Sequence, residues 1–209
     1  MTQDGVVYVV DDDESVRRSL VRLLRSVGLE AVAFPSATAF LEREIVDRPS
    51  CLILDLRLRG PSGLDLQAEL SGKQQSIPII FITGHGTVPA SVRAMKGGAL
   101  DFIEKPFDDS ELLESVQRAL ARSRDAYADH AERDVIQRRL DTLTPREQQV
   151  LKLVVRGMLN KQIAADLGAA EKTIKIHRGR VMKKMQADSV ANLVRMAQRL
   201  GLEEQVNRS

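Results

Sequence analysis

Residues 6–14 read Val6-Val7-Tyr8-Val9-Val10-Asp11-Asp12-Asp13-Glu14, five largely apolar side chains followed directly by four acidic ones. A short, continuously apolar run is typical of a strand that is buried on both faces of a parallel sheet. In open α/β sheets, the loops at the carboxyl ends of the strands form the binding site. This stretch therefore predicts a buried parallel strand and an acidic site at its end.

Four more apolar runs follow, and segments with helical patterning separate them. The runs predict strands at Ala31–Phe34, Leu52–Leu54, Ile77–Thr83 and Asp101–Ile103. The other segments predict helices at Ser15–Val27, Ala37–Val46, Gly63–Ser71, Val88–Lys96 and from Asp109 onward. Five strands that alternate with five helices predict an α/β domain, a doubly wound five-stranded parallel sheet with helices on both faces.

The pattern changes after residue 122. Residues 123–141 are polar and contain no Gly or Pro, which predicts a helical linker that continues the fifth helix; a frayed loop is the alternative. A second domain opens at Thr144-Pro145-Arg146-Glu147, where Thr144 and Glu147 can form a capping box. Its helices are predicted at Pro145–Arg156, Lys161–Leu167, Glu171–Met185 and Ser189–Leu200. We expect one domain over 1–122 and a small, four-helix, all-α domain over 142–209.

Charge is divided unevenly along the chain. From Thr142 onward there are 13 Lys and Arg against 6 Asp and Glu, a net +7, while residues 1–141 hold 18 against 23, a net −5. This asymmetry suggests that the second domain faces a polyanion, although two ordinary surfaces of uneven charge are the alternative. The sequence shows no signal peptide and no apolar run of about 18 residues, so we expect a cytoplasmic protein without membrane contact.

Reactive side chains follow four of the predicted strands. The first strand ends in Asp11-Asp12-Asp13, the third in Asp55, the fourth in Thr83 and the fifth in Lys105. Clustered carboxylates raise one another's pKa unless a cation relieves the repulsion, and oxygen ligands of this kind suit Mg²⁺. The cation and Lys105 would neutralise a phosphoryl group on a carboxylate nucleophile. The alternative is that the three consecutive acids form only a solvated helix start.

These segments resemble the receiver domain of two-component response regulators, most closely the FixJ/NarL type. The resemblance covers Val6 to about Arg122 and implies a flavodoxin-like fold. The matching segments are Val10-Asp11-Asp12-Asp13-Glu14, Asp55-Leu56-Arg57, Ile82-Thr83-Gly84-His85-Gly86 and Asp101-Phe102-Ile103-Glu104-Lys105-Pro106-Phe107.

The resemblance also implies roles for single residues. Asp55 is implied to be the phosphoacceptor, and Mg²⁺ is implied to bind Asp11, Asp12, Asp55 and the carbonyl of Arg57. By the same resemblance, the phosphoryl oxygens contact Thr83 and Lys105, and the switch consists of Thr83 and Phe102. The Lys105–Pro106 bond is expected to be cis, an arrangement that is common only before proline.

The loop after Asp55 departs from the family pattern. The family usually has Met-Pro two to four residues after the acceptor Asp, whereas this chain has Leu58-Arg59-Gly60-Pro61-Ser62-Gly63, with the proline displaced by two residues. We expect the loop to take another path, which affects loss of the phosphoryl group more than its acceptance. Arg59 could approach the phosphoryl group, and a solvated surface arginine is the simpler interpretation.

The second domain has the spacing of helix, short turn and helix. Ile174, Val181 and Met185 fall on one face of the second helix and are expected to pack inward. The opposite face carries Lys172, Ile176, Gly179 and Lys183. A basic outer face suits the DNA major groove, and an ordinary solvated surface helix is the alternative.

Leu143-Thr144-Pro145-Arg146-Glu147, Asn160-Lys161-Gln162-Ile163-Ala164 and Lys172-Thr173-Ile174-Lys175-Ile176-His177 closely resemble the LuxR-type helix-turn-helix, from Leu143 to about Leu200. The residues implied to face bases are Lys175, Ile176 and Gly179. Those implied to meet phosphates are Lys161, Thr173, His177, Arg178 and Lys183. Two residues depart from the pattern: Ala170 replaces a capping Ser, and Gly179 either leaves a base pair unread or lets the backbone come closer.

The favoured hypothesis is a transcription factor gated by phosphorylation, not an enzyme. The resemblance implies a sensor histidine kinase as phosphoryl donor, homodimerisation on phosphorylation and binding to double-stranded DNA; RNA polymerase is a further expected partner. A haloacid-dehalogenase-like enzyme would need a second Asp two residues after the first, where this chain has Arg57. A DNA-binding scaffold that ignores phosphorylation is disfavoured because the full set of receiver residues is present.

Overall fold

The structure is a computed structural model in which residues 5–42, 48–72, 77–84 and 88–202 are described. The chain separates into two compact units, Met1–Ala128 and Asp129–Ser209, and each is considered by itself. The end of the helix predicted over Ala37–Val46 lies outside the described residues, as do His85 and Gly86 of the quoted motif. Among the helices described, none combines the length and apolar character needed to cross a bilayer.

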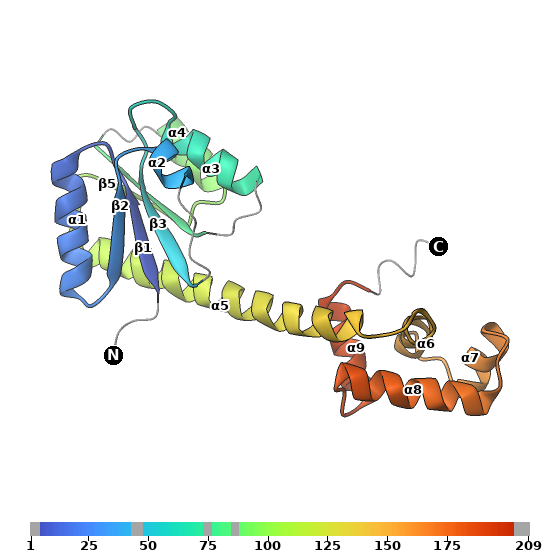
Figure 1. The fold of residues 1–209 in the computed structure, drawn as a ribbon. Coiled ribbons are helices and arrows are strands. Elements are labelled where there is room, and N and C mark those ends of the chain that lie inside the picture. Colours follow the sequence, from blue (N-terminus) through green and yellow to red (C-terminus); the bar gives the residue numbers. More distant parts are fainter. Residues whose placement is uncertain (1–4, 43–47, 73–76, 85–87, 203–209) are drawn as a thin grey trace. The chain divides into compact units, whose positions relative to one another are not determined.

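The first unit contains a five-stranded parallel sheet in the order β2-β1-β3-β4-β5. Its strands are β1 (Val6–Val10), β2 (Glu30–Phe34), β3 (Ser50–Asp55), β4 (Ile79–Thr83) and β5 (Asp101–Glu104). Figure 1 shows helices on both faces of this sheet. One face carries α1 (Glu14–Ser26) and α5 (Asp109–Asp141), and the other carries α2 (Ala37–Leu41), α3 (Gly63–Gly72) and α4 (Val88–Lys96). The predicted fold class is confirmed.

The side chains of β1 pack into two separate hydrophobic cores, because successive residues of a strand point to opposite faces of the sheet. Tyr8 packs in an aromatic cluster with Phe34 and Phe40 on the α2–α4 face. Val7 and Val9 pack on the α1–α5 face. Since both faces are covered, all five residues of β1 are buried. This explains why the run is apolar until the chain leaves the sheet.

Cys51 lies within β3 and is completely buried. It is the only cysteine in the chain, so no internal disulfide can form. Burial disfavours the thiolate and raises the pKa of the Cys51 thiol.

The second unit is built from four helices that follow α5. These are α6 (Pro145–Val155), α7 (Asn160–Asp166), α8 (Glu171–Met185) and α9 (Val190–Arg199). The predicted capping box is present: Glu147 N–H donates to Thr144 Oγ1 over 3.3 Å, and Thr144 N–H donates to Glu147 Oε2 over 2.9 Å. The core is aliphatic, with Val150, Ile163 and Leu193 fully buried.

The polar segment 123–141 lies within α5, and its two ends contribute to different units. Ser123 is buried, and its hydroxyl accepts a 2.9 Å hydrogen bond from Ser50 N–H at the start of β3. Ile136 is buried in the aliphatic core of the second unit. The apolar residues of this segment differ in burial, because Tyr127 is 39% exposed while Ile136 is 3% exposed.

Candidate functional site

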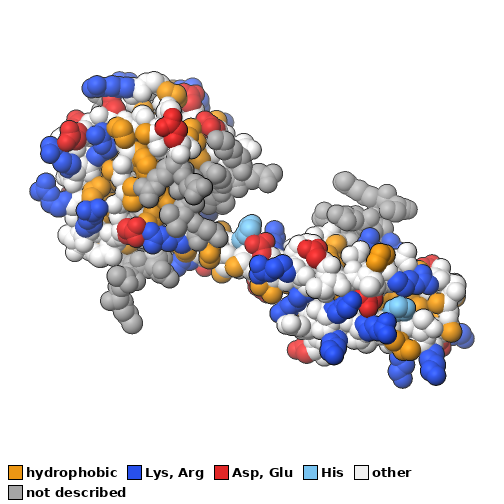
Figure 2. Space-filling model, in the orientation of Figure 1, with side chains coloured by type: hydrophobic (Ala, Val, Ile, Leu, Met, Phe, Trp, Pro, Cys, Tyr) orange, Lys and Arg blue, Asp and Glu red, His pale blue; other side chains and the backbone are white. Residues whose placement is uncertain are grey.

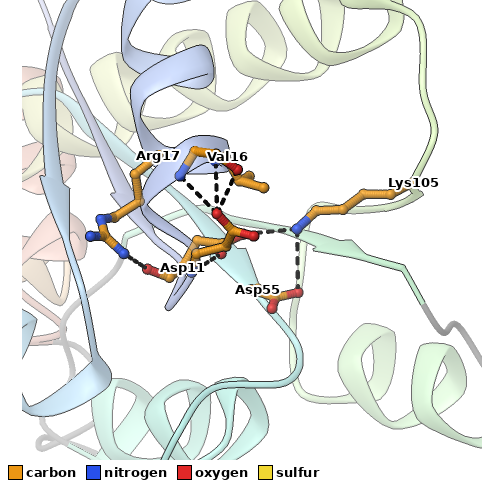
Figure 3. Close-up of polar contacts among 7 residues, drawn as sticks. Asp11, Val16, Arg17, Asp55 and Lys105 are labelled. Atoms are coloured by element: carbon orange, nitrogen blue, oxygen red, sulfur yellow. Dashed lines mark hydrogen bonds and ion pairs between the residues drawn. The ribbon is translucent and has the colours of Figure 1, made fainter.

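The register of the sheet brings the predicted acidic residues to one edge. Val10 pairs with Leu54, so Asp11 and Asp55 leave their neighbouring strands at the same level. Carboxylate oxygens of Asp11, Asp12 and Asp55 all lie within 4.8 Å of one another. Lys105, which follows β5, places its Nζ 2.8 Å from Asp11 Oδ2 and 3.8 Å from Asp55 Oδ1 (Figure 3). Residues far apart in the sequence thus form one pocket.

The acidic run after β1 divides into two parts with different tasks. Asp13 is the N-cap of α1, and its Oδ1 accepts a 2.7 Å hydrogen bond from Ser15 N–H. Hydrogen bonds from the Ser15 hydroxyl and backbone lower the pKa of the Asp13 carboxyl. The interpretation as a helix start therefore holds for Asp13, whereas Asp11 is 1% exposed and belongs to the pocket.

Asp11 is held by contacts on both its side chain and its backbone. Its Oδ1 accepts a 2.8 Å hydrogen bond from Asp13 N–H. Arg17, on α1, donates from Nη1 to the Asp11 carbonyl over 2.8 Å (Figure 3). The sequence analysis missed Arg17, because one arginine among several on an amphipathic helix gives no signal of a tertiary contact.

Asp55 is the carboxyl group with the most perturbed environment in the pocket. Burial is the main reason that the pKa of Asp55 is raised to about 6; Lys105 opposes this rise, and the nearby Asp11 and Asp12 contribute to it. A backbone hydrogen bond from Arg57 also favours the charged form. The carboxylates of Asp11, Asp12 and Asp55 form a donor set suited to a hard divalent cation, because oxygen ligands of this kind suit Mg²⁺ and a cation relieves their mutual repulsion.

The remaining predicted receiver residues lie on β4 and β5 beside the acidic group. Thr83 is the buried last residue of β4, and its carbonyl accepts a 2.7 Å hydrogen bond from Lys105 N–H. The Lys105–Pro106 bond is cis, as expected. Phe102 is half-buried, with its ring centroid 6.3 Å from that of Phe81.

Arg59 is mostly exposed, yet it is not a purely solvated arginine. Its Nε lies 3.0 Å from Oδ2 of Asp12, and 89% of its side chain is accessible to solvent. The displaced proline drew attention to this loop, and the sequence analysis allowed Arg59 to approach the phosphoryl site, but it did not identify Asp12 as the partner.

In the second unit, α8 has one buried face and one basic, exposed face. Ile174, Val181 and Met185 are buried, as predicted. The exposed residues are Lys172, Thr173, Lys175, Ile176, Gly179, Arg180 and Lys183, and Lys161 is exposed on α7. In Figure 2, Lys and Arg side chains gather over α8 in this unit. Ala170 precedes the helix without a side-chain capping bond, as expected from the missing Ser.

Two of the predicted DNA contacts are less accessible than the others. Arg178 is half-buried and donates from Nη1 to Oδ1 of Asn160 over 3.1 Å, so it connects α8 to α7. His177 is also half-buried. The sequence analysis missed the ion pair between Lys184 Nζ and Glu147 Oε2, which are 2.6 Å apart and join α8 to the first turn of α6.

Comparisons with known proteins agree with both halves of this architecture. The family "Response regulator receiver domain" matches residues 7–117, and the family "Bacterial regulatory proteins, luxR family" matches residues 141–197. The chain belongs to the response regulators. Its second domain is of the LuxR type.

Relatives of this response regulator match it over nearly its whole length. It is 56% identical to Nodulation protein W of Bradyrhizobium diazoefficiens, over 95% of this chain and 87% of that protein. It is 46% identical to the transcriptional regulatory protein FixJ of Rhizobium meliloti, over 93% and 95% of the two chains. The solved structure of the response regulator StyR is 44% identical, covers 94% of this chain and 99% of its own, and superposes with a TM-score of 0.83.

Membership in this family assigns the general partners of the response regulator. The receiver domain implies a histidine kinase partner, and the LuxR-type domain implies DNA binding. The group of Asp11, Asp12 and Asp55 lies in the receiver domain, and the basic face of α8 lies in the LuxR-type domain.

Proposed function

We propose that a sensor histidine kinase phosphorylates Asp55 in a Mg²⁺-dependent reaction, and that this promotes dimerisation and sequence-specific DNA binding. The observation that carries the proposal is the pocket of Asp11, Asp12 and Asp55, with Lys105 Nζ 3.8 Å from Asp55. Asp11, Asp12, Asp55 and the Arg57 carbonyl would hold Mg²⁺, which would supply positive charge for the incoming phosphoryl oxygens.

Asp55 is suited to be the nucleophile because it is buried at the end of β3, the central strand of the sheet. Its carboxylate would attack the phosphorus atom of the donor and form an acyl phosphate, while the bond from phosphorus to the donor breaks. Lys105 and the Thr83 hydroxyl would then contact the phosphoryl oxygens. Thr83 and Phe102, on adjacent strands, would pass the change to the surface of β5.

A homodimer is supported by an apolar surface on α4. Val88 is 78% exposed, and Val92 and Met95 are each close to half exposed. Exposed apolar side chains on one helix are typical of an interaction surface. We propose that phosphorylation shifts the population of conformations toward one in which this surface joins two copies.

We propose that α8 reads DNA, with Lys175, Ile176 and Gly179 facing bases. Lys161, Thr173, His177, Arg178 and Lys183 would position the domain on phosphates. In this organisation, residues 1–122 form the receiver domain, 123–141 the linker and 142–209 the DNA-binding domain. RNA polymerase would be a further partner. Chromosomal DNA, the polymerase and the phosphoryl-donating part of the kinase would all be met in the cytoplasm.

The proposal is tested by adding beryllofluoride and Mg²⁺ to the full chain. We expect sedimentation to detect more dimer, and DNA affinity to rise about 5- to 150-fold, the usual range of coupling between two sites. Asp55→Asn should remove both responses. Unchanged association and unchanged DNA binding would overturn the proposal and favour a scaffold that ignores phosphorylation, whereas steady phosphate release from phosphomonoesters would indicate an enzyme.

Gly179→Ala should stabilise the protein while weakening DNA binding. A Cβ at this position would meet no atom within 4 Å, so the fold itself does not require glycine there. Alanine should gain up to about 1 kcal/mol of helix stability. Glycine at position 179 lowers helix stability and the fold does not need it, so we infer that the DNA backbone or bases approach this position closely. We therefore expect Gly179→Ala to bind DNA at least about tenfold more weakly, as for one lost base contact.

The matched control for this experiment is Gln186→Gly, at the residue that caps the C-terminal end of the same helix. Gln186 has φ +54°, so glycine should also stabilise α8, but away from the centre of its exposed face. Binding is measured by titration of labelled DNA, and stability by thermal unfolding. If Gly179→Ala binds DNA as tightly as the control, the position is unread and close approach is excluded.

A further inference from the structure

The β3–α3 loop carries a cation into the acidic pocket. We propose that Arg59 competes with Mg²⁺ for Asp12, and so raises the Mg²⁺ concentration that the unphosphorylated receiver domain needs. The inference rests on the proposed function, in which Asp12 is a metal ligand. Its geometric basis is the 3.0 Å separation between Arg59 Nε and Asp12 Oδ2.

The loop is anchored at both ends, which keeps Arg59 near the pocket. At its start, Leu56 N–H donates to the Ile82 carbonyl over 3.2 Å, and Gly63 N–H donates back to the Leu56 carbonyl over 3.1 Å. At its end, the Ser62 backbone and hydroxyl both donate to Oδ2 of Asp65, over 2.8 and 2.6 Å. The segment between these anchors is therefore short and closed on itself.

Glycines fix the path of this loop. A Cβ on Gly63 would lie 2.4 Å from the Asp55 carbonyl, so α3 can begin against the end of β3 only with glycine there. Gly60 has φ +99°, a conformation that L side chains rarely adopt. Leu58 packs against the core while Arg59, the next residue, reaches Asp12. The resemblance to the family would place a proline at position 59, two residues before Pro61. This chain has Arg59 there, and unlike proline an arginine can form an ion pair with a carboxylate.

The charges of the pocket favour competition. Lys105 pairs with Asp11 and Asp55, and Arg59 pairs with Asp12, so each of the three carboxylates has a cation within 4.0 Å. A divalent cation that binds the same oxygens must displace the guanidinium from Asp12. The pair is weak enough to be displaced, because an ion pair with one partner 89% exposed is screened by water and salt.

The test measures Mg²⁺ affinity directly, by calorimetry or by amide NMR shifts of the full chain, since the chain has no Trp to report binding by fluorescence. Arg59→Ala should bind Mg²⁺ about two- to fivefold more tightly than wild type, the range expected for an exposed ion pair. Arg59→Lys keeps the charge and should fall between them. The gain should shrink as ionic strength rises from about 0.05 M to about 0.5 M.

Arg18→Ala is the matched control, because Arg18 forms an exposed ion pair with Glu14 on α1, 3.6 Å apart, outside the pocket. It removes the same charge and should leave Mg²⁺ affinity unchanged. Equal affinities for wild type and Arg59→Ala would overturn the inference while leaving the metal site intact. If neither protein binds Mg²⁺ at millimolar concentration, the proposed function itself loses its metal site, and the two failures are distinguishable.

Discussion

Asp55→Asn should abolish phosphoryl incorporation from acetyl phosphate and Mg²⁺, because an amide cannot act as the nucleophile. Intact-mass spectrometry of the full chain measures the modification. Asp13→Asn is the control: it neutralises an acid in the same sequence neighbourhood, but Asp13 caps α1 and Asn caps helices equally well. We expect the control to be labelled almost as well as wild type. Normal labelling of Asp55→Asn would assign the phosphoacceptor elsewhere.

The same substitution should stabilise the metal-free fold, which shows that lost labelling is not lost folding. Asp55 has a pKa raised from 3.8 to about 6, mainly by burial, so its ionised form opposes folding. The stability that this group contributes is present below pH about 4 and is lost as the pH rises through about 6. At pH 7, Asp55→Asn should unfold at a higher temperature than wild type. Its free energy of unfolding should be higher by about 1–2 kcal/mol, less than the full pKa shift would give, because solvent screens a partly exposed group.

Glu147→Gln should strongly destabilise the second unit. Glu147 is 2% exposed and accepts hydrogen bonds from Thr144 N–H and from Lys184 Nζ, the latter over 2.6 Å. Removing its charge leaves Lys184 without its ionic partner and weakens the capping box of α6. We expect a loss of about 2–3 kcal/mol, less than the roughly 3–5 kcal/mol of a fully buried broken pair, because Lys184 is 35% exposed.

The effect of Glu147 should depend on pH in a defined direction. The hydrogen bond from Lys184, with that from the Thr144 backbone, lowers the pKa of Glu147 from 4.5 to about 2. Its stabilisation is therefore complete above pH about 4.5 and is lost as the pH falls toward 2. Amide exchange in α6 measures the stability of this unit within the full chain. Glu171→Gln, at an exposed acid of α8, should cost no more than about 1 kcal/mol.

The acidic pocket could be predicted because few physical rules determine it. Parallel strands bring their carboxyl ends to one edge, so Asp11, Asp55, Thr83 and Lys105 could be placed together from the ends of four apolar runs. The helix starts at Asp13 and Thr144 could be predicted from the preference of short polar side chains for unpaired backbone N–H groups. Such local and topological rules explain why the predicted strands lie within two residues of the observed ones.

Contacts made by long charged side chains could not be predicted in this way. Arg17 reaches a backbone carbonyl, Arg59 reaches Asp12, and Lys184 reaches Glu147 across two helices. Each side chain has many rotamers, and its partner is chosen by the tertiary structure and not by sequence periodicity. The separation of Asp13 from Asp11 was likewise invisible, because the two acids differ only in where the chain turns into α1.

The position of Cys51 gives the protein a built-in reporter. As the sole thiol, buried in the central strand that leads to Asp55, it can react with an alkylating probe only when that strand becomes accessible. The rate of alkylation therefore measures how often the middle of the receiver domain opens, without a label or an added mutation. Comparing this rate with and without a phosphoryl mimic would give the rigidity that signalling adds to the sheet.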